Sequence, residues 1–272
     1  MRPETEKASV RPAAVAGLFY PNDPQQLRDV VAQYLANAPV NNLRSAPKAL
    51  IVPHAGYVYS GPVAAAAYAR IAARRNEIRR VVLLGPSHRV HLQGIALPRS
   101  EAFRTPLGAL EIDPDGKALL LQGADIVWSD TPHAQEHCLE VQLPFLQMIL
   151  EDFTVLPLVV GSASPQQVAT VLATFWDDEQ TLVLISSDLS HYHDYERAQA
   201  IDRATSEAIL RRSSSLSGEQ ACGAVCINGL LYLCRERGLD VSEIVRMNSG
   251  DTAGDRQRVV GYGAFAVEQR EH

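Results

Sequence analysis

The sequence lacks an excess of basic residues and any long apolar run. It carries 25 Lys and Arg against 31 Asp and Glu among 272 residues, a formal net charge of −6. A mildly acidic chain offers no electrostatic footprint for nucleic acid or for an anionic membrane. No run approaches the roughly 18 apolar residues of a spanning helix, and the first residues contain no stretch typical of a signal peptide. We therefore expect a cytoplasmic protein with no nucleic-acid partner and no membrane partner.

Cysteines are few and form no C-x-x-C pair: they are Cys138, Cys222, Cys226 and Cys234. The last three are spaced by four and eight residues in an apolar segment, which places them near one face of a helix. Buried and inert thiols are the simplest interpretation of this pattern. A reducing compartment fits it best.

Motifs of two large enzyme classes are also missing. The chain has no Walker A sequence, the glycine-rich loop that cradles phosphates. It has no G-x-S-x-G elbow, which carries the nucleophile of α/β-hydrolases. A P-loop nucleotidase and an α/β-hydrolase are therefore disfavoured.

Apolar runs of strand length alternate with longer helical patterns, as in α/β proteins. The length suits one large α/β domain. We predict a single domain over residues 1–272, with a central, mostly parallel or mixed sheet flanked by helices. Strands are expected at 50–52, 80–85, 153–160, 181–185, 241–247 and 259–267, helices at 62–75, from 165, at 195–212 and at 219–237, and an irregular or hairpin segment at 94–112.

Three predicted strands are followed by polar side chains. His54 follows the first strand, His88 the second, and Asp188 and His191 the strand at 181–185. Ligands of open α/β sheets bind outside the carboxyl ends of the strands, so we expect these side chains at one rim. Imidazoles with a carboxylate suit Fe(II), Zn or Cu, and two His with one carboxylate leave metal positions open for substrate and dioxygen.

A fourth cluster lies at 133–140 and contains the pattern H-x-x-E-H. On one helix this pattern binds zinc in a group of peptidases. A second interpretation has His137 and Glu140 begin a helix that continues to Leu150 and face the same crevice as the other histidines. A third is a solvated helix start without function.

The turn-rich segment at 248–255 follows the predicted strand at 241–247. Its Gly, Ser and Asp residues are typical of a loop that brings a carboxylate, such as Asp251, into the crevice. They are equally typical of a plain connecting turn.

Seven motifs occur in a characteristic order over roughly 210 residues. They are Arg11-Pro12 with Ala16-Gly17-Leu18-Phe19-Tyr20-Pro21, Pro53-His54-Ala55-Gly56-Tyr57, Leu84-Gly85-Pro86-Ser87-His88, Phe103-Arg104-Thr105-Pro106-Leu107-Gly108, Glu136-His137-Cys138-Leu139-Glu140, Ser186-Ser187-Asp188-Leu189-Ser190-His191 and Cys222-Gly223. Together they resemble the Memo family, which accompanies AMMECR-type and radical-SAM proteins in many genomes. That family is similar in fold to class III extradiol ring-cleavage dioxygenases, whose non-haem Fe(II) is held by two His and a Glu.

The resemblance implies a metal site. His54 and His88 fall at the family's first two metal-site positions, and the third lies near 251–252. Some Memo proteins have a Cys there, but this segment has none. The resemblance therefore leaves Asp251 as the candidate third ligand, with Fe(II) as the expected metal and Zn or Cu as alternatives.

The resemblance also implies catalytic and substrate-binding residues. His191, with Asp188, falls where the dioxygenases keep an acid/base histidine, and we expect the carboxylate to hold the tautomer of that ring. His137 is a second histidine of the pocket. The side chains expected to bind substrate are Tyr57, Ser87, Arg104 and Glu140.

Three functions remain open from the sequence. The leading hypothesis is a metal-dependent oxidoreductase of the extradiol-dioxygenase type, with a small-molecule substrate. The second is a non-catalytic module that binds a metal or a ligand, such as a peptide, and acts with AMMECR-type or radical-SAM partners. The third is a zinc hydrolase that uses the same rim or the H-x-x-E-H pattern.

Overall fold

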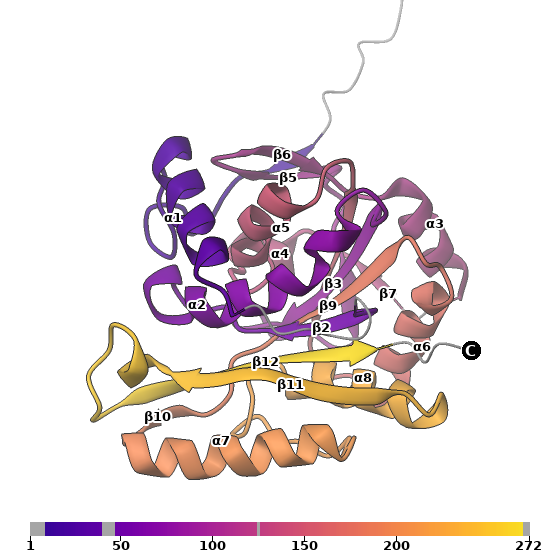
Figure 1. Cartoon of the computed structure of the whole chain (residues 1–272). Coiled ribbons are helices and arrows are strands. Elements are labelled where there is room, and N and C mark those ends of the chain that lie inside the picture. Colours follow the sequence, from indigo (N-terminus) through magenta and orange to yellow (C-terminus); the bar gives the residue numbers. More distant parts are fainter. Residues whose placement is uncertain (1–8, 40–46, 124–125, 269–272) are drawn as a thin grey trace, which may run out of the picture.

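A computed structural model of the chain describes residues 9–39, 47–123 and 126–268 (Figure 1). Its central sheet is built from β2 (Ala49–Val52), β3 (Arg80–Pro86), β4 (Ile95–Leu97), β7 (Ile126–Trp128), β8 (Thr154–Val160), β9 (Thr181–Ser186), β10 (His191–His193), β11 (Asp240–Asn248) and β12 (Val259–Glu268). The strand order is β10-β12-β2-β9-β3-β8-β4-β7, and β11 pairs with β12. The expected mixed α/β sheet is therefore confirmed.

The middle of the sheet is parallel. β2, β9, β3 and β8 run in one direction, whereas β12 and β4 are antiparallel to β2 and β8. Every residue of β2 and β9, and all but the first residue of β3 and β8, is buried. Continuous apolar runs are typical of strands that are covered on both faces, and this explains why these four strands could be predicted from the sequence.

Helices cover both faces of this sheet. They are α1 (Pro24–Ala36), α2 (Tyr57–Tyr68), α3 (Pro114–Gly123), α4 (Thr131–Ala134), α5 (Leu143–Ile149), α6 (Pro165–Trp176), α7 (Tyr195–Leu210) and α8 (Ala224–Glu236), with 3-10 turns η1 (Ala69–Arg74), η2 (Glu140–Gln142) and η3 (Ser249–Asp251). α2 packs on β2, β11 and β12 beside α1 and α5, and α6 and α8 pack on each other and on β9. Figure 1 shows α2 and α7 on opposite sides of the β11–β12 pair.

The segment expected to be irregular splits between two sheets. β4 joins the central sheet, whereas β5 (Ala102–Thr105) and β6 (Gly108–Glu111) form a hairpin. β1 (Val10–Arg11) pairs in parallel with β5 and completes a small three-stranded sheet. Gly108 closes the hairpin with a φ of 130°, a conformation that L side chains rarely adopt.

Two helix starts differ from the sequence prediction. α2 begins at Tyr57 rather than near Pro62, so Pro62 lies inside the helix. The helix tolerates it because a proline removes only one helix hydrogen bond, and burial along most of the helix stabilises the rest. α8 begins at Ala224 rather than near 219, so residues 219–223 form turns. α6 begins at Pro165 as expected, with a reciprocal capping box between Ser164 and Gln167.

Most of the described buried hydrophobic residues form one continuous core that includes the sheet and both helical layers. None of the helices in the described part of the chain has the length and apolar character needed to cross a bilayer.

Candidate metal centre

The polar strand ends meet in one cleft, as the strand pattern predicted. His54 follows β2, His88 follows β3, and Asp188 and His191 follow β9. These four side chains and His137 line a single cleft of about 1220 Å³. The cleft lies where β2, β9 and β3 end side by side, because parallel strands place their carboxyl ends at one edge.

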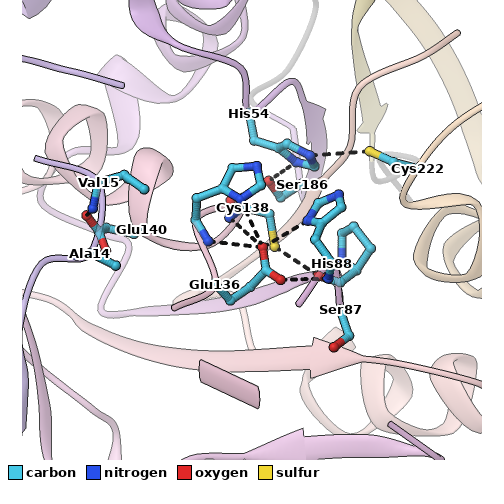
Figure 2. Close-up of polar contacts among 12 residues, drawn as sticks. Ala14, Val15, His54, Ser87, His88, Glu136, Cys138, Glu140, Ser186 and Cys222 are labelled. Atoms are coloured by element: carbon cyan, nitrogen blue, oxygen red, sulfur yellow. Dashed lines mark hydrogen bonds and ion pairs between the residues drawn. The ribbon is translucent and has the colours of Figure 1, made fainter. Parts of the chain in front are cut away.

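Three donor side chains converge at the bottom of the cleft. His54, His88 and Cys222 each present a ligand atom, and these atoms all lie within 4.8 Å of one another. Figure 2 shows the two imidazoles and the thiol around one point. His54 is buried, the His88 side chain is 27% exposed, and Cys222 is partly exposed. Two imidazoles and a thiol are a donor set for first-row transition metals.

The tautomer of His54 follows from its hydrogen bonds. His54 Nδ1 lies 2.9 Å from Ser186 Oγ. The single Ser186 proton is donated to the carbonyl of Cys138, and Ser186 Oγ also accepts a bond from Gln142. Ser186 therefore accepts from His54, which must carry its proton on Nδ1. The lone pair of Nε2 then points toward Cys222 Sγ, 3.3 Å away.

Burial, and then the neighbouring His88, lower the pKa of His54 to about 3. The imidazole is thus neutral near pH 7, which is the form that binds a metal.

Glu136 holds His88 in the corresponding orientation. Its carboxylate accepts the His88 backbone N–H at 2.7 Å and lies 2.9 Å from His88 Nδ1. The same carboxylate accepts the backbone N–H groups of His137 and Cys138. Burial alone would raise the pKa of Glu136, but the bonds from His88 outweigh it and lower the pKa to about 2. An ionised Glu136 leaves His88 Nε2 free to face the other donors.

Replacement of Glu136 by Gln is expected to weaken metal binding by about 10- to 100-fold, the usual cost of losing a partner that orients a metal-binding histidine. The amide nitrogen cannot accept the N–H bonds that the second carboxylate oxygen accepts. Competition with a chelator measures the affinity, and exposed Glu151→Gln is the matched control. An affinity equal to that of the control would contradict the role assigned to Glu136.

Cys222 does not lie within the helix, although its spacing to the other cysteines suggested that it does. It lies just before α8, and its neighbour Gly223 packs so closely on β9 that a Cβ there would be 2.9 Å from the Ser186 carbonyl oxygen. Cys222 Sγ accepts the Asp188 backbone N–H at 3.3 Å. Burial, and then Asp188, raise the pKa of Cys222 to about 12. A bound cation reverses such a shift by stabilising the thiolate.

Cys226 and Cys234 are buried thiols within α8, as expected. Sequence reasoning missed Cys222 because its spacing to these two residues is helical. The Cys222-Gly223 pair among the ordered motifs was the signal that singled it out.

A second donor group shares His88 and adds Glu136 and Cys138. Glu136 is already engaged by three backbone N–H groups, and Cys138 donates to the carbonyl of Pro86. His54, His88 and Cys222 are therefore the better candidate donor group.

Asp251 does not join these donors. Its carboxylate accepts the Asn248 backbone N–H at 2.9 Å and the Tyr195 hydroxyl at 2.5 Å, and the residue is exposed. These bonds close the turn after β11, so the carboxylate caps η3. Asp251, the expected third ligand, therefore lies outside the donor group, in which Cys222 accompanies the two histidines.

Asp188 contacts His54 rather than His191. Its Oδ1 accepts the His54 backbone N–H at 2.7 Å, and its Oδ2 lies 3.9 Å from His54 Nε2. Burial raises the pKa of Asp188. Among the residues that the structure describes, no hydrogen bond joins Asp188 to His191, so the expectation that Asp188 holds that ring's tautomer is wrong.

His137 lies against the two metal-site imidazoles. Its ring centroid is 5.4 Å from that of His54 and 4.8 Å from that of His88, and Phe19 packs on its other side. Burial, and then the charge of His54, lower the pKa of His137 to about 4. His137 is therefore a neutral imidazole in the cleft wall.

Four residues expected to bind substrate lie outside the cleft. Tyr57 is buried and donates to the carbonyl of Val141. The Ser87 hydroxyl donates to the carbonyl of Val90 and points away from the imidazoles in Figure 2. Arg104 is exposed on β5, in the separate small sheet.

Glu140, the fourth, anchors the N-terminal segment. It pairs with Arg11 at 2.5 Å and accepts bonds from the Ala14 and Val15 backbones and from the Tyr20 hydroxyl. Figure 2 shows this group well apart from the histidines. Its carboxylate is fully buried, so Glu140 has a structural role.

The H-x-x-E-H pattern does not form a peptidase site. α4 contains only four residues, so His133 and His137 do not share a helix face. His133 is buried beneath Phe103, and its Nε2 contacts the Ala96 carbonyl at 3.1 Å. Only His137 of this pair reaches the cleft.

The fold and cleft together define an α/β protein with a candidate metal centre at the carboxyl ends of its parallel strands. A family model described as Memo-like protein matches residues 11–266. The chain belongs to this Memo-like family, which confirms the resemblance carried by the ordered motifs.

Curated relatives match over nearly their whole length. A MEMO1 family protein of Aquifex aeolicus is 36% identical over 269 residues, which cover 93% of this chain and 97% of the relative. One from Methanopyrus kandleri is 34% identical over 281 residues, covering 95% and 99%. One from Ignicoccus hospitalis is 34% identical, covering 94% and 97%.

Proposed function

We propose that the protein is a metal-dependent oxidoreductase of the non-haem iron type, with Fe(II) held by His54, His88 and Cys222. The observation that supports it is the convergence of three donor atoms within 4.8 Å at the bottom of an open cleft. Both imidazoles are held at Nδ1, by Ser186 and by Glu136, so that Nε2 of each is available. The thiolate makes the site softer than the carboxylate site expected, so Cu and Zn are the competing metals.

When bound, iron supplies a Lewis-acidic, redox-active centre with positions open to dioxygen and a chelating substrate. The chain's own groups orient the site and handle protons. Asp188 accepts the backbone N–H of His54 and so fixes the position of that residue. His191 lines the cleft and is placed to take a proton from substrate or return it. His137, whose pKa is lowered by burial, lines the same cleft as a neutral imidazole.

Metal analysis of anaerobically purified protein tests this proposal. We expect about one equivalent of iron in the wild type. His54→Ala and His88→Ala are expected to lose it, because each removes one of three donors. His91→Ala is the matched control, since this exposed histidine contacts Gln93 outside the donor group.

Oxygen uptake with a panel of catechols then tests the chemistry. Iron at the expected level without uptake on any substrate would contradict the oxidoreductase. Zinc in place of iron, lost in the same two variants, would favour a hydrolase or a structural role. No metal after anaerobic reconstitution would favour the binding module that acts with AMMECR-type or radical-SAM partners.

A further inference from the structure

The cleft continues outward from the metal donors to a mouth with two arginines. The mouth is lined by β10, by Arg197 in the first turn of α7, and by Arg258 just before β12. β10 runs between the β11–β12 pair and α7 (Figure 1). The same cleft therefore joins the donor group to a cationic rim.

An irregular β10 brings three consecutive side chains into this wall. In a regular strand, neighbouring side chains point to opposite faces. His191, Tyr192 and His193 nevertheless all line the cleft. The pairing register with β12 shifts between His191 and His193, and Tyr192 has a φ of 63°. Such a conformation is costly for a bulky residue and is typical of functional sites.

The two guanidinium groups at the mouth have no acidic partner. Arg197 makes no side-chain hydrogen bond or ion pair with any residue that the structure describes. Arg258 likewise forms no ion pair within the described ranges, and its Cζ lies 5.2 Å from the centroid of the Tyr192 ring. Guanidinium groups without an acidic partner are suited to bind an oxyanion such as a carboxylate or phosphate.

The acidic residues of the mouth select the kind of anion. Glu219 and Asp255 line the same cleft. Asp255 accepts the backbone N–H groups of Gln257 and Arg258, so it stays in place beside the arginines. Two carboxylates disfavour a doubly charged phosphate more than a singly charged carboxylate, because like charges repel.

Aromatic residues supply the remaining wall. Phe19, Tyr59 and Tyr192 line the cleft, and Tyr192 is 64% exposed. Flat apolar surfaces of this kind pack against flat apolar ligands.

We propose that the ligand of this cleft is a small aromatic carboxylate, whose carboxylate binds Arg197 and Arg258 while its opposite end reaches the metal donors. This inference names the substrate class of the proposed function and rests on it for the metal-bound end. The arginines act as specificity-determining residues.

Paired probes that differ by one carboxylate test the proposal. Calorimetry on the metal-loaded protein compares 3,4-dihydroxybenzoate with catechol, and we expect the acid to bind about tenfold tighter, equivalent to about 1.4 kcal/mol. The double variant Arg197→Gln/Arg258→Gln is expected to bind both equally. Arg256→Gln is the control, because Arg256 stacks on Tyr195 outside the cleft lining.

A second pair of probes separates this inference from the metal proposal. In metal-free protein, ligand-observed NMR compares benzoate with phenol and with phenyl phosphate. Preference for benzoate that is lost in the double variant supports the carboxylate subsite even where iron does not bind. Equal binding of benzoate and phenol, tighter binding of phenyl phosphate, or an unchanged preference in the double variant would overturn it, whatever the metal content.

Discussion

Replacement of Cys222 by Ser is expected to lower metal affinity by at least about a hundredfold. This loss of affinity exceeds the loss expected for Glu136→Gln, because Cys222 is itself a proposed ligand, whereas Glu136 only orients one. A serine hydroxyl does not ionise near neutral pH, whereas a metal cation stabilises the thiolate of Cys222. Asp251→Asn is expected to leave the affinity unchanged, because Asp251 caps the turn at η3 and bonds Tyr195.

The two variants are compared by chelator competition and by Co(II) substitution. A thiolate ligand gives a sulfur-to-cobalt charge-transfer band, which Cys222→Ser must lose and Asp251→Asn must keep. Circular dichroism checks that both variants are folded. Loss of metal in Asp251→Asn together with retention in Cys222→Ser would return the third position to the carboxylate.

Removal of the Glu140 carboxylate is expected to destabilise the metal-free protein by about 3–5 kcal/mol, the usual cost of breaking a buried ion pair. Glu140→Ala leaves the Arg11 guanidinium without its carboxylate and the Ala14 and Val15 N–H groups without an acceptor. Urea unfolding measures the change in the free energy of unfolding.

Glu207→Ala is the matched control for this comparison. Glu207 pairs with Arg211 at 3.5 Å, but both side chains are more than half exposed. Such surface pairs contribute about 0–1 kcal/mol. A Glu140 variant that is as stable as the control, yet binds ligand poorly, would instead restore the substrate-binding role expected from the sequence.

The strand ends of the site could be predicted because their pattern is local. Residues 50–52, 80–85 and 181–185 are apolar runs of strand length, and each is followed by Gly, Pro or Ser with a His or Asp. Parallel strands then bring His54, His88 and Asp188 to one edge without further information. The same reasoning explains why His191 was placed in the cleft, whereas His137 was placed there by the family resemblance and by its position before the helix that ends near Leu150.

The third donor could not be predicted in this way. Cys222 lies 34 positions after Asp188, in a segment whose cysteine spacing is helical. Whether it faces solvent, the helix core or the cleft depends on where α8 begins and on how closely Gly223 approaches β9. Both depend on how segments that are distant in the sequence pack together.

Glu140 shows the opposite failure, in which a carboxylate beside pocket residues was taken for a binding group. Its partner Arg11 lies 129 positions away in the sequence, so no local pattern links them. Burial of the Arg11 guanidinium without a carboxylate partner would cost free energy of folding. Glu140 supplies that partner, so its role is structural.

The sequence by itself therefore determined the alternating α/β order, the parallel centre of the sheet and the edge at which its histidines meet. Periodicity and strand direction act over a few residues, and each can be followed along the chain. Only the tertiary structure decided which carboxylates hold the framework, that Cys222 rather than Asp251 lies beside the two imidazoles, and that Arg197 and Arg258 share a cleft with these donors. These relations depend on close packing between distant segments, which local sequence does not encode.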